Sequence, residues 1–361
     1  MTLILTSDQT AERSLGNLYG TTGPSDYAAL LDFTRDFYRV RENGETKSIP
    51  LEDALIGKRT TVATSFNDAG VLVDEPIGSV RVNTTQGNQG RLDAGIRGLL
   101  SEPTSTNYLL NSTTPATQTV TVATGTYTLS VYGTGSATAS GDLSAGAGVA
   151  ATDGSPVTMT VTGSGVVTIT VAGTLTGFQL EKLAFPTSLI KTTGATVSRN
   201  RDYAELSQRL FDAIGGDSGQ GTAIAHVTPY KGVTGSSFVF RYSRPVGEAA
   251  NGSIQLQMVA PTSATYIIND DSSVAQFGAA LPLPVGEAPF KTGMAFQADD
   301  FAGFLKGRTI DTDGAGTVPT SVSRIEIGGT NLSGAGLGGI VTKLIFYNRR
   351  LTNDELIAAV G

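Results

Sequence analysis

The segment 101–176 constrains the fold most strongly, because threonine and serine alternate there with apolar residues and glycine interrupts each run. The alternation is clearest in the stretches 126–131, 157–161 and 167–171. A period of two puts one kind of side chain on each face of a β-strand. Threonine suits the outward face because it is β-branched and polar without charge. The segment is therefore predicted to form short strands joined by glycine turns, as in a sandwich or jelly roll.

The same segment also stands apart in charge. Glu102, Asp142 and Asp153 are its only charged residues, and it contains no lysine or arginine. So abrupt a change in composition indicates a separate module. The full chain of 361 residues also exceeds the size of about 250–300 residues at which one hydrophobic core usually stops growing.

Three regions are predicted from these shifts, and all are expected to be rich in β-structure. They are a β-rich N-terminal region at 1–97, a jelly roll at 98–200 and a second β-sandwich at 201–361. Strands of the last region are expected at 223–228, 237–242, 253–259, 264–268, 291–297, 303–306, 324–328 and 340–347. The fold class is therefore all-β, with tandem sandwich or jelly-roll modules.

The chain is expected to end in a short helix. Thr352 and Glu355 have the spacing of a capping box, and Leu351 and Leu356 have the spacing of a hydrophobic staple.

Composition excludes several classes of protein. Apolar residues make up 39% of the chain, charged residues make up 16%, and 45 residues are glycine, which favours short strands over long helices. A net charge of −7 without a Lys/Arg cluster disfavours nucleic acid as a partner. The absence of cysteine excludes disulfides, thiolate metal sites and a cysteine nucleophile.

The first residues do not resemble a secretory signal. Residues 1–8 have no basic stretch and an apolar run of only three residues, Leu3 to Leu5. No apolar stretch approaches the roughly 18 residues that a membrane span requires. We therefore expect no signal peptide and no membrane insertion.

Three blocks of sequence resemble the modular tail-fibre and receptor-binding proteins of tailed bacteriophages, and they occur in the same order. They are LDFTR at 31–35, DAGVL at 68–72 and GLLSEPTSTNYLLNS at 98–112. In that family the third block leads into a jelly roll similar to carbohydrate-binding modules. Its end resembles GFQLE at 177–181 and FPTSLI at 185–190, followed by the connector 192–199.

The last module is similar to concanavalin-like or laminin-G-like sandwiches. The blocks that carry this likeness lie at 294–296, 304–307, 318–320, 325–328 and 344–356. Residues 1–29 have no counterpart, and their position alone suggests attachment to a particle.

The resemblance implies a fibre or spike subunit of a virion, synthesised in the host cytoplasm. Its implied partners are capsid or tail proteins, further copies of itself in a homotrimer, and host cell-surface polysaccharide. Alternatives are a head decoration or head-fibre protein, a glycan-degrading tail enzyme (a depolymerase) and a cellular lectin.

The residues offer no catalytic constellation, and the chain is expected not to be an enzyme. Asp270–Asp271 and Asp299–Asp300 are sequence neighbours that would project to opposite faces of a strand, not toward one glycosidic bond. His226 is the only histidine, and it is expected to be packed and hydrogen-bonded in a strand.

No cofactor is expected, although calcium is an alternative. Asp311 and Asp313 precede a glycine with the opening spacing of a calcium loop, but the later ligands of that loop are absent. An Asp-Gly turn is the favoured interpretation.

Glycan recognition usually relies on aromatic faces, and tryptophan is absent from the chain. Tyr132 faces outward in its expected strand and Tyr266 is expected near a loop, although core or interface packing is the favoured role for each. Together with Asp311 and Asp313 they are the candidate ligand-binding residues, and no catalytic or metal-binding residue is predicted.

Overall fold

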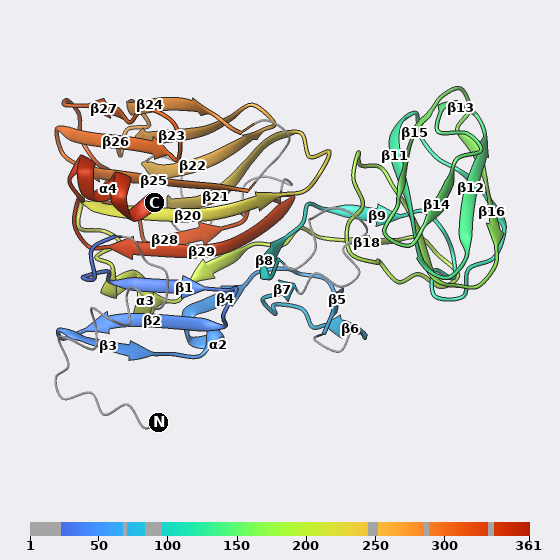
Figure 1. The fold of residues 1–361 in the computed structure, drawn as a ribbon, viewed down its shortest axis with the longest axis horizontal. Helices are drawn as coiled ribbons and strands as arrows, with labels where there is room; N and C mark the ends of the chain where they lie inside the picture. The colour runs from blue at the N-terminus through green and yellow to red at the C-terminus, as the bar shows by residue number, and fades with distance from the viewer. Residues whose placement is uncertain (1–22, 68–70, 84–95, 245–251, 285–288, 331–335) are drawn as a thin grey trace.

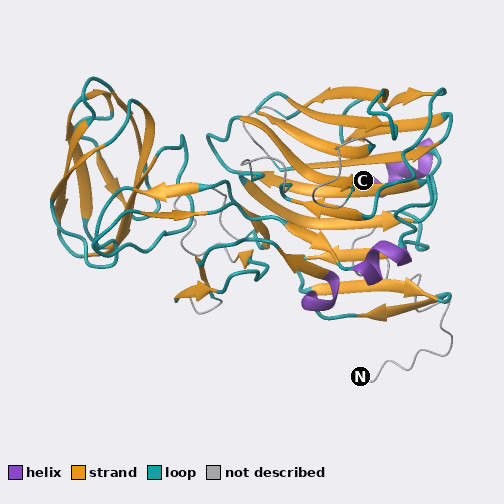
Figure 2. Cartoon of the chain, turned by 180° about the vertical axis from the view of Figure 1, so that it is seen from behind, coloured by secondary structure: helices purple, strands orange, loops and turns teal. Residues whose placement is uncertain are grey.

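The computed structural model describes residues 23–67, 71–83, 96–244, 252–284, 289–330 and 336–361. These residues form a large β-sandwich and a smaller jelly roll beside it, joined by a narrow two-stranded ribbon (Figure 1). Strands dominate and helices are short (Figure 2), which confirms the all-β prediction. The N-terminal segment expected to attach to a particle lies mostly outside the described residues, as does the glycine turn at 68–70.

The large sandwich consists of two antiparallel sheets. Its ten-stranded sheet, counted over the described residues, has the order β27-β26-β25-β20-β29-β1-β2-β3, with β8 pairing β29 and β7 pairing β8. These strands are β27 (Asp311–Asp313), β26 (Asp300–Leu305), β25 (Phe290–Gln297), β20 (Gly221–Pro229), β29 (Gly339–Tyr347), β1 (Ala29–Asp32), β2 (Phe37–Glu42), β3 (Glu45–Ser48), β8 (Gly98–Ser101) and β7 (Val82–Asn83).

The seven-stranded sheet, likewise counted over the described chain, packs against it in the order β24-β23-β22-β21-β28-β19-β4. Its members are β24 (Ala275–Pro282), β23 (Ser263–Asn269), β22 (Ser253–Ala260), β21 (Gly235–Ser243), β28 (Arg324–Ile327), β19 (Ala204–Leu206) and β4 (Leu55–Gly57). Side chains from both sheets form one hydrophobic core between them. The short helices α2 (Leu51–Ala54) and α3 (Gln208–Ala213) pack close to each other beside this sheet.

The jelly roll has two four-stranded sheets in the described chain, with the orders β10-β16-β12-β14 and β13-β15-β11-β17. They comprise β10 (Gln118–Thr121), β16 (Val166–Ala172), β12 (Ser136–Gly141), β14 (Ala150–Thr152), β13 (Leu143–Ala145), β15 (Val157–Val161), β11 (Gly125–Gly133) and β17 (Leu175–Glu181). In β15 the apolar residues are buried and the threonines are wholly or partly exposed. The expected alternation is therefore confirmed in that strand.

The module boundaries differ from those expected. The region 1–97 is not a separate module, because β1 pairs with β29 and β4 pairs with β19, so strands from both ends of the chain share the same two sheets. The jelly roll is instead an insertion between β8 and β19. It is connected by the ribbon of β9 (Ser105–Asn107) and β18 (Val197–Arg199). Composition could not reveal pairing between strands so distant in the chain, such as that of Ala29 with Phe346.

The outer face of the ten-stranded sheet, opposite the shared core, is partly covered by the C-terminal helix α4 (Asn353–Val360). Thr352 and Glu355 form the predicted capping box, and Leu356 packs in the small core beneath the helix. Gly293 in β25 permits this close approach, because a Cβ there would lie 2.9 Å from a methyl carbon of Leu356.

Candidate functional site

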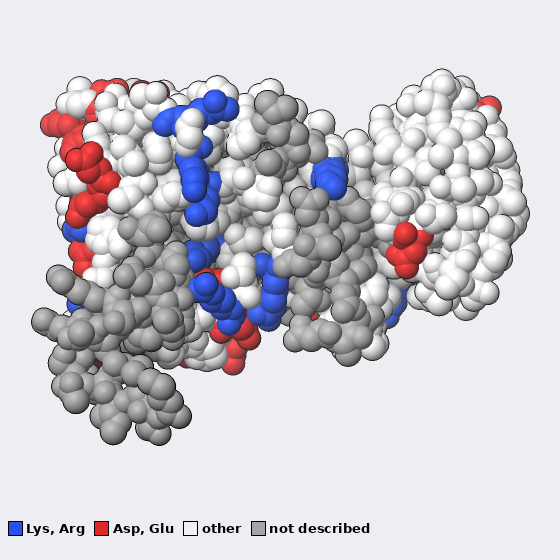
Figure 3. All heavy atoms as spheres, in the orientation of Figure 1, with Lys and Arg blue, Asp and Glu red and all other residues white. Residues whose placement is uncertain are grey.

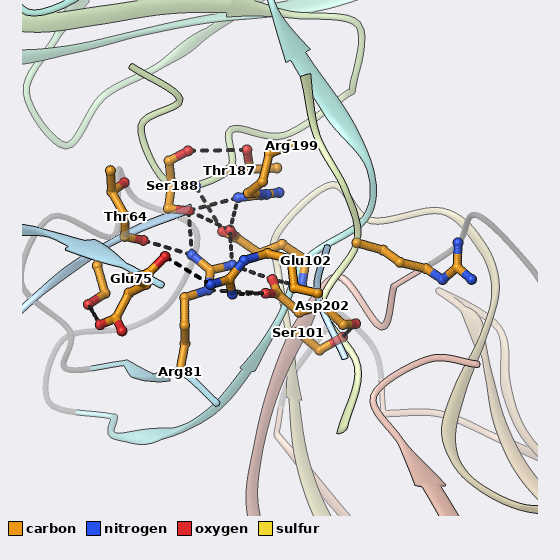
Figure 4. A network of polar contacts seen from close by, with 12 residues as sticks. Thr64, Glu75, Arg81, Ser101, Glu102, Thr187, Ser188, Arg199 and Asp202 are labelled. Carbon is orange, nitrogen blue, oxygen red and sulfur yellow. Dashed lines mark hydrogen bonds and ion pairs between the residues drawn. The ribbon is translucent and has the colours of Figure 1, made fainter. Parts of the chain in front are cut away.

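Glu102 and Arg199, which belong to the sequence blocks at 98–112 and 192–199, meet other charged residues in a buried cluster where the jelly roll joins the large sandwich (Figure 4). The guanidinium of Arg81 lies 2.8 Å from the carboxylate of Glu102 and also pairs with Asp202. Arg199 pairs with the same Glu102 carboxylate, and Ser188 donates to it from its backbone N at 2.8 Å and its hydroxyl at 2.6 Å. All five residues are buried.

Arg59 completes this cluster through a 2.8 Å ion pair with Asp202, and we call the six residues the junction network. Burial by itself would lower the pKa of Arg81, but Asp202 and Glu102 hold that pKa above its ordinary value. The two carboxylates thus offset most of the positive charge of the three guanidinium groups. The sequence blocks at 98–112, 185–190 and 192–199 contribute side chains to this network. The described cavity beside Arg81 and Asp202 has a volume of only about 10 Å³, too small for a sugar.

The two predicted tyrosines are buried. Tyr132 stacks against Phe66 of β5 (Ala63–Phe66) with ring centroids 5.8 Å apart, and β5 forms a hairpin with β6 (Leu72–Glu75). Tyr266 lies between the two large sheets, where its hydroxyl and that of Thr292 are 2.5 Å apart. A ring must face solvent to stack on a sugar, so neither tyrosine presents a sugar-binding surface. Tyr132 was misjudged because β11 is buried on both faces along most of its length.

The two predicted aspartates lie on the solvent side of an edge strand, whereas Tyr266 is buried between the sheets: Asp311 pairs with Gly303, whose backbone packs on the ring of Tyr266. Asp311 and Asp313 are exposed in the edge strand β27, and Asp313 accepts a hydrogen bond from the backbone N of Ala315 at 3.1 Å. Among the described residues, no group of three or more His, Cys, Asp or Glu side chains could hold a metal ion. The structure does not bring the four predicted residues into one site.

The neighbouring acid pairs contribute to turns and ion pairs. Asp270 accepts the backbone N–H groups of Ser272 and Val274, both within 2.9 Å. Asp300 pairs with Arg350 at 2.6 Å.

A row of basic side chains crosses the outer face of the ten-stranded sheet, and sequence reasoning missed it. In strand register His226 of β20 lies between Lys343 of β29 and Lys291 of β25. Lys306 follows, because its backbone N donates to the backbone O of Lys291 at 3.0 Å. We call these four residues the basic row. Figure 3 shows lysine and arginine gathered in a band across the face that carries α4.

A cavity of about 420 Å³ opens beside the basic row. Its described lining consists of His226, Val227, Thr228, Pro284, Pro289, Phe290, Lys291, Lys306 and Thr342. No aspartate or glutamate is among these lining residues. The described lining of the cavity therefore combines apolar walls, two threonines and two ammonium groups, with no carboxylate side chain among these residues.

His226 is half-buried in this cavity rather than packed and hydrogen-bonded as expected. Its Nε2 atom has no hydrogen-bond partner among the residues that the structure describes. Burial, together with the positive charges of Lys343 and Lys291, lowers the pKa of His226 to about 3. The imidazole is thus neutral near pH 7, and it does not add to the positive charge of the lysines.

A larger cavity of about 720 Å³ lies near the turn between β2 and β3, and its lining carries both acidic and basic side chains. Arg209 contacts the Glu42 carboxylate at 2.5 Å, and this hydrogen bond lowers the pKa of Glu42 to about 2. The acidic and basic side chains of this lining offset one another, which leaves little net attraction for a charged ligand. The smaller cavity beside the basic row is therefore the candidate binding site.

No helix in the described part of the chain is long and apolar enough to cross a membrane. No protein-family model matches the sequence, and no curated protein matches it.

The fold is similar to solved structures that contain β-sandwich modules. One is the carbohydrate-binding module CBM40 of the Ruminococcus gnavus IT-sialidase bound to α2,3-sialyllactose, with 19% identity over 39% of this chain and 82% of that chain and a TM-score of 0.35. The leech intramolecular trans-sialidase is 19% identical over 39% of this chain and 23% of its own, with a TM-score of 0.34. The Trypanosoma rangeli sialidase in complex with the inhibitor DANA is 14% identical over 45% of this chain and 27% of its own, with a TM-score of 0.34.

These matches correct one expectation. The prediction that the chain is not an enzyme is contradicted, because sialidases are among the matched structures, and we no longer hold it. The matches assign no reaction to this chain, since this degree of likeness concerns the fold alone. At that level, the expected similarity to carbohydrate-binding modules is confirmed.

Proposed function

We propose that this chain is a glycan-binding adhesion protein, a fibre or spike subunit of a tailed phage or phage-like particle. The observation that carries the glycan-binding part is the cavity beside the basic row. Its volume of about 420 Å³ lies within the roughly 300–1,000 Å³ typical of small-ligand sites. Its position on the outer face of the large sandwich leaves it open to a surface polysaccharide.

The virion role is supported by the ordered sequence blocks that resemble phage fibre proteins. In this proposal the chain binds capsid or tail proteins, assembles with copies of itself as a homotrimer, and resides in the virion after synthesis in the host cytoplasm. Attachment to the head rather than the tail is the alternative within the same class. No cofactor is required, so glycan binding should be unchanged when a chelator removes calcium.

Two measurements test the two parts of this function. The full chain, labelled on a lysine-independent tag, is applied to an array of bacterial surface polysaccharides, where binding to at least one glycan is expected and uniform absence of binding contradicts adhesion. Mass spectrometry of purified particles should find the chain in stoichiometric amounts with capsid and tail proteins. Its absence from particles would overturn the virion role.

A further inference from the structure

We infer that the cavity beside the basic row takes an anionic saccharide, with the carboxylate or phosphate of one sugar unit held between Lys291 and Lys306. The inference rests on the proposed glycan binding and specifies the chemical class of the glycan. It follows from the charges, the lining and the position of the cavity.

The described residues balance only part of the positive charge of the basic row. Asp32 neutralises Lys343 at 3.2 Å, and its other carboxylate oxygen accepts two hydrogen bonds from Thr34. Lys306 has no aspartate or glutamate partner among the described residues. Nζ of Lys291 donates to the main-chain oxygen of Gly361 at 3.3 Å, and in this chain that oxygen belongs to the terminal carboxylate, which offsets part of the charge of Lys291. The site thus concentrates positive charge in a chain whose net charge is −7.

Lys291 is repelled by the positive charges of its two lysine neighbours. Burial and the neighbouring charges of Lys306 and Lys343 lower the pKa of Lys291. A bound anion would relieve this repulsion, and its contacts with the ammonium groups would be charge-assisted hydrogen bonds.

The remaining lining suits a sugar better than a bare anion. Val227, Pro284 and Pro289 offer apolar surface to a ring face, while Thr228 and Thr342 supply hydroxyl groups at the same cavity. Small-ligand sites typically combine such apolar walls with a few placed polar groups. An acidic sugar unit matches both parts of the lining.

The NMR signal of His226 can report on binding in the cavity, because His226 is the only histidine of the chain and it lines the cavity. Its imidazole signal is followed by NMR in the full chain, prepared without a histidine tag. The probes are 3′-sialyllactose, which carries a carboxylate, and glucose 6-phosphate, which carries a phosphate. Lactose is the neutral counterpart, and inorganic phosphate is an anion without a sugar.

The inference predicts that at least one acidic sugar, at millimolar concentration, shifts the His226 signal and raises the pKa of the imidazole. Lys291→Gln and Lys306→Gln should each weaken that binding about tenfold, the effect of one charge-assisted hydrogen bond. Lys182→Gln is the matched control, because it removes the same charge from an exposed position near the end of the jelly roll. Binding of 3′-sialyllactose would identify a carboxylate as the recognised group, and binding of glucose 6-phosphate would identify a phosphate.

Four outcomes would overturn the inference. Absence of a shift with both acidic sugars, or equal binding of lactose, would reject an anionic saccharide. Equal binding of inorganic phosphate would reject the sugar component, and binding that survives both lysine substitutions would reject the site. Adhesion itself fails separately, if the polysaccharide array gives no binding to neutral or acidic glycans.

Discussion

The junction network and the basic row are both groups of cationic side chains, but they differ in what neutralises them. In the junction network, Arg81 and Arg199 meet the buried carboxylate of Glu102. In the basic row, Lys291 and Lys306 face a cavity without an acidic partner among its described residues. A planar guanidinium can satisfy a carboxylate with fixed geometry, whereas a lysine keeps rotatable donors on a flexible stem. The difference separates charges that hold the modules together from charges that remain available to a ligand.

The largest effect on stability is expected for a substitution in the junction network. Glu102→Gln leaves Arg81 and Arg199 without their shared counter-charge in a buried site, and we expect a loss of about 3–5 kcal/mol in the free energy of unfolding. Urea denaturation measures the loss. Glu45→Gln, an identical change at an exposed position, is the control. A Glu102→Gln protein as stable as the control would show that the network is not a structural centre.

The next largest effect concerns His226 and the loss of stability at acidic pH. Its pKa of about 3 in the folded protein lies below its ordinary value of about 6.5, so between these values the unfolded chain binds a proton that the folded chain does not. Stability is therefore full above pH 6.5 and is lost as pH falls, by up to about 1.4 kcal/mol per pH unit. Denaturation of wild type and His226→Gln between pH 7 and pH 5 should diverge by about 2 kcal/mol.

The comparison of wild type with His226→Gln cancels the titration of other groups. The charges facing the imidazole are Lys343, Lys291, Lys306 and Asp32, and all are present in both proteins. Parallel stability curves would contradict the buried, neutral histidine.

A smaller effect on stability is expected from the buried, uncharged hydroxyl group of Tyr266. Tyr266→Phe removes the hydroxyl that contacts Thr292 in the opposite sheet, and we expect about 1 kcal/mol of destabilisation from the lost hydrogen bond. Thermal unfolding measures this cost. Polysaccharide binding should be unchanged, whereas a specific loss of binding would restore Tyr266 as a ligand contact.

The smallest effect on stability is expected for a substitution in the basic row. Lys306 is exposed, so Lys306→Gln should change the free energy of unfolding by no more than about 0.5 kcal/mol. Urea denaturation provides the measurement. A large destabilisation would mean that the basic row, like the junction network, is needed for folding.

The features that could be predicted from the sequence are those that depend on periodic patterns and on residues close together in the chain. The strand at 157–161 and the capping box of Thr352 and Glu355 were confirmed, because alternation and capping depend on near neighbours. The block beginning at Gly98 was assigned to the jelly roll, but its first strand pairs with β29 instead. Pairing partners so distant in the chain leave no local signal.

The candidate site was missed for the same reason. His226, Lys291, Lys306 and Lys343 come from four separate parts of the sequence, and only strand register aligns them. The lysine positions were visible as single charges in or beside expected strands, which is an ordinary pattern for solvated residues. A register prediction for these strands would have been needed to find the row.

The ribbon that carries the jelly roll has an evolutionary consequence. The chain leaves the large sandwich through β9 and returns through β18, and these strands pair side by side, with Ser105 opposite Arg199. Exchange of the DNA between these two points would replace one whole module while leaving every strand of the host sandwich in its order. Provided that Glu102 and Arg199 remain to anchor the ends, this geometry favours shuffling of inserted modules by recombination.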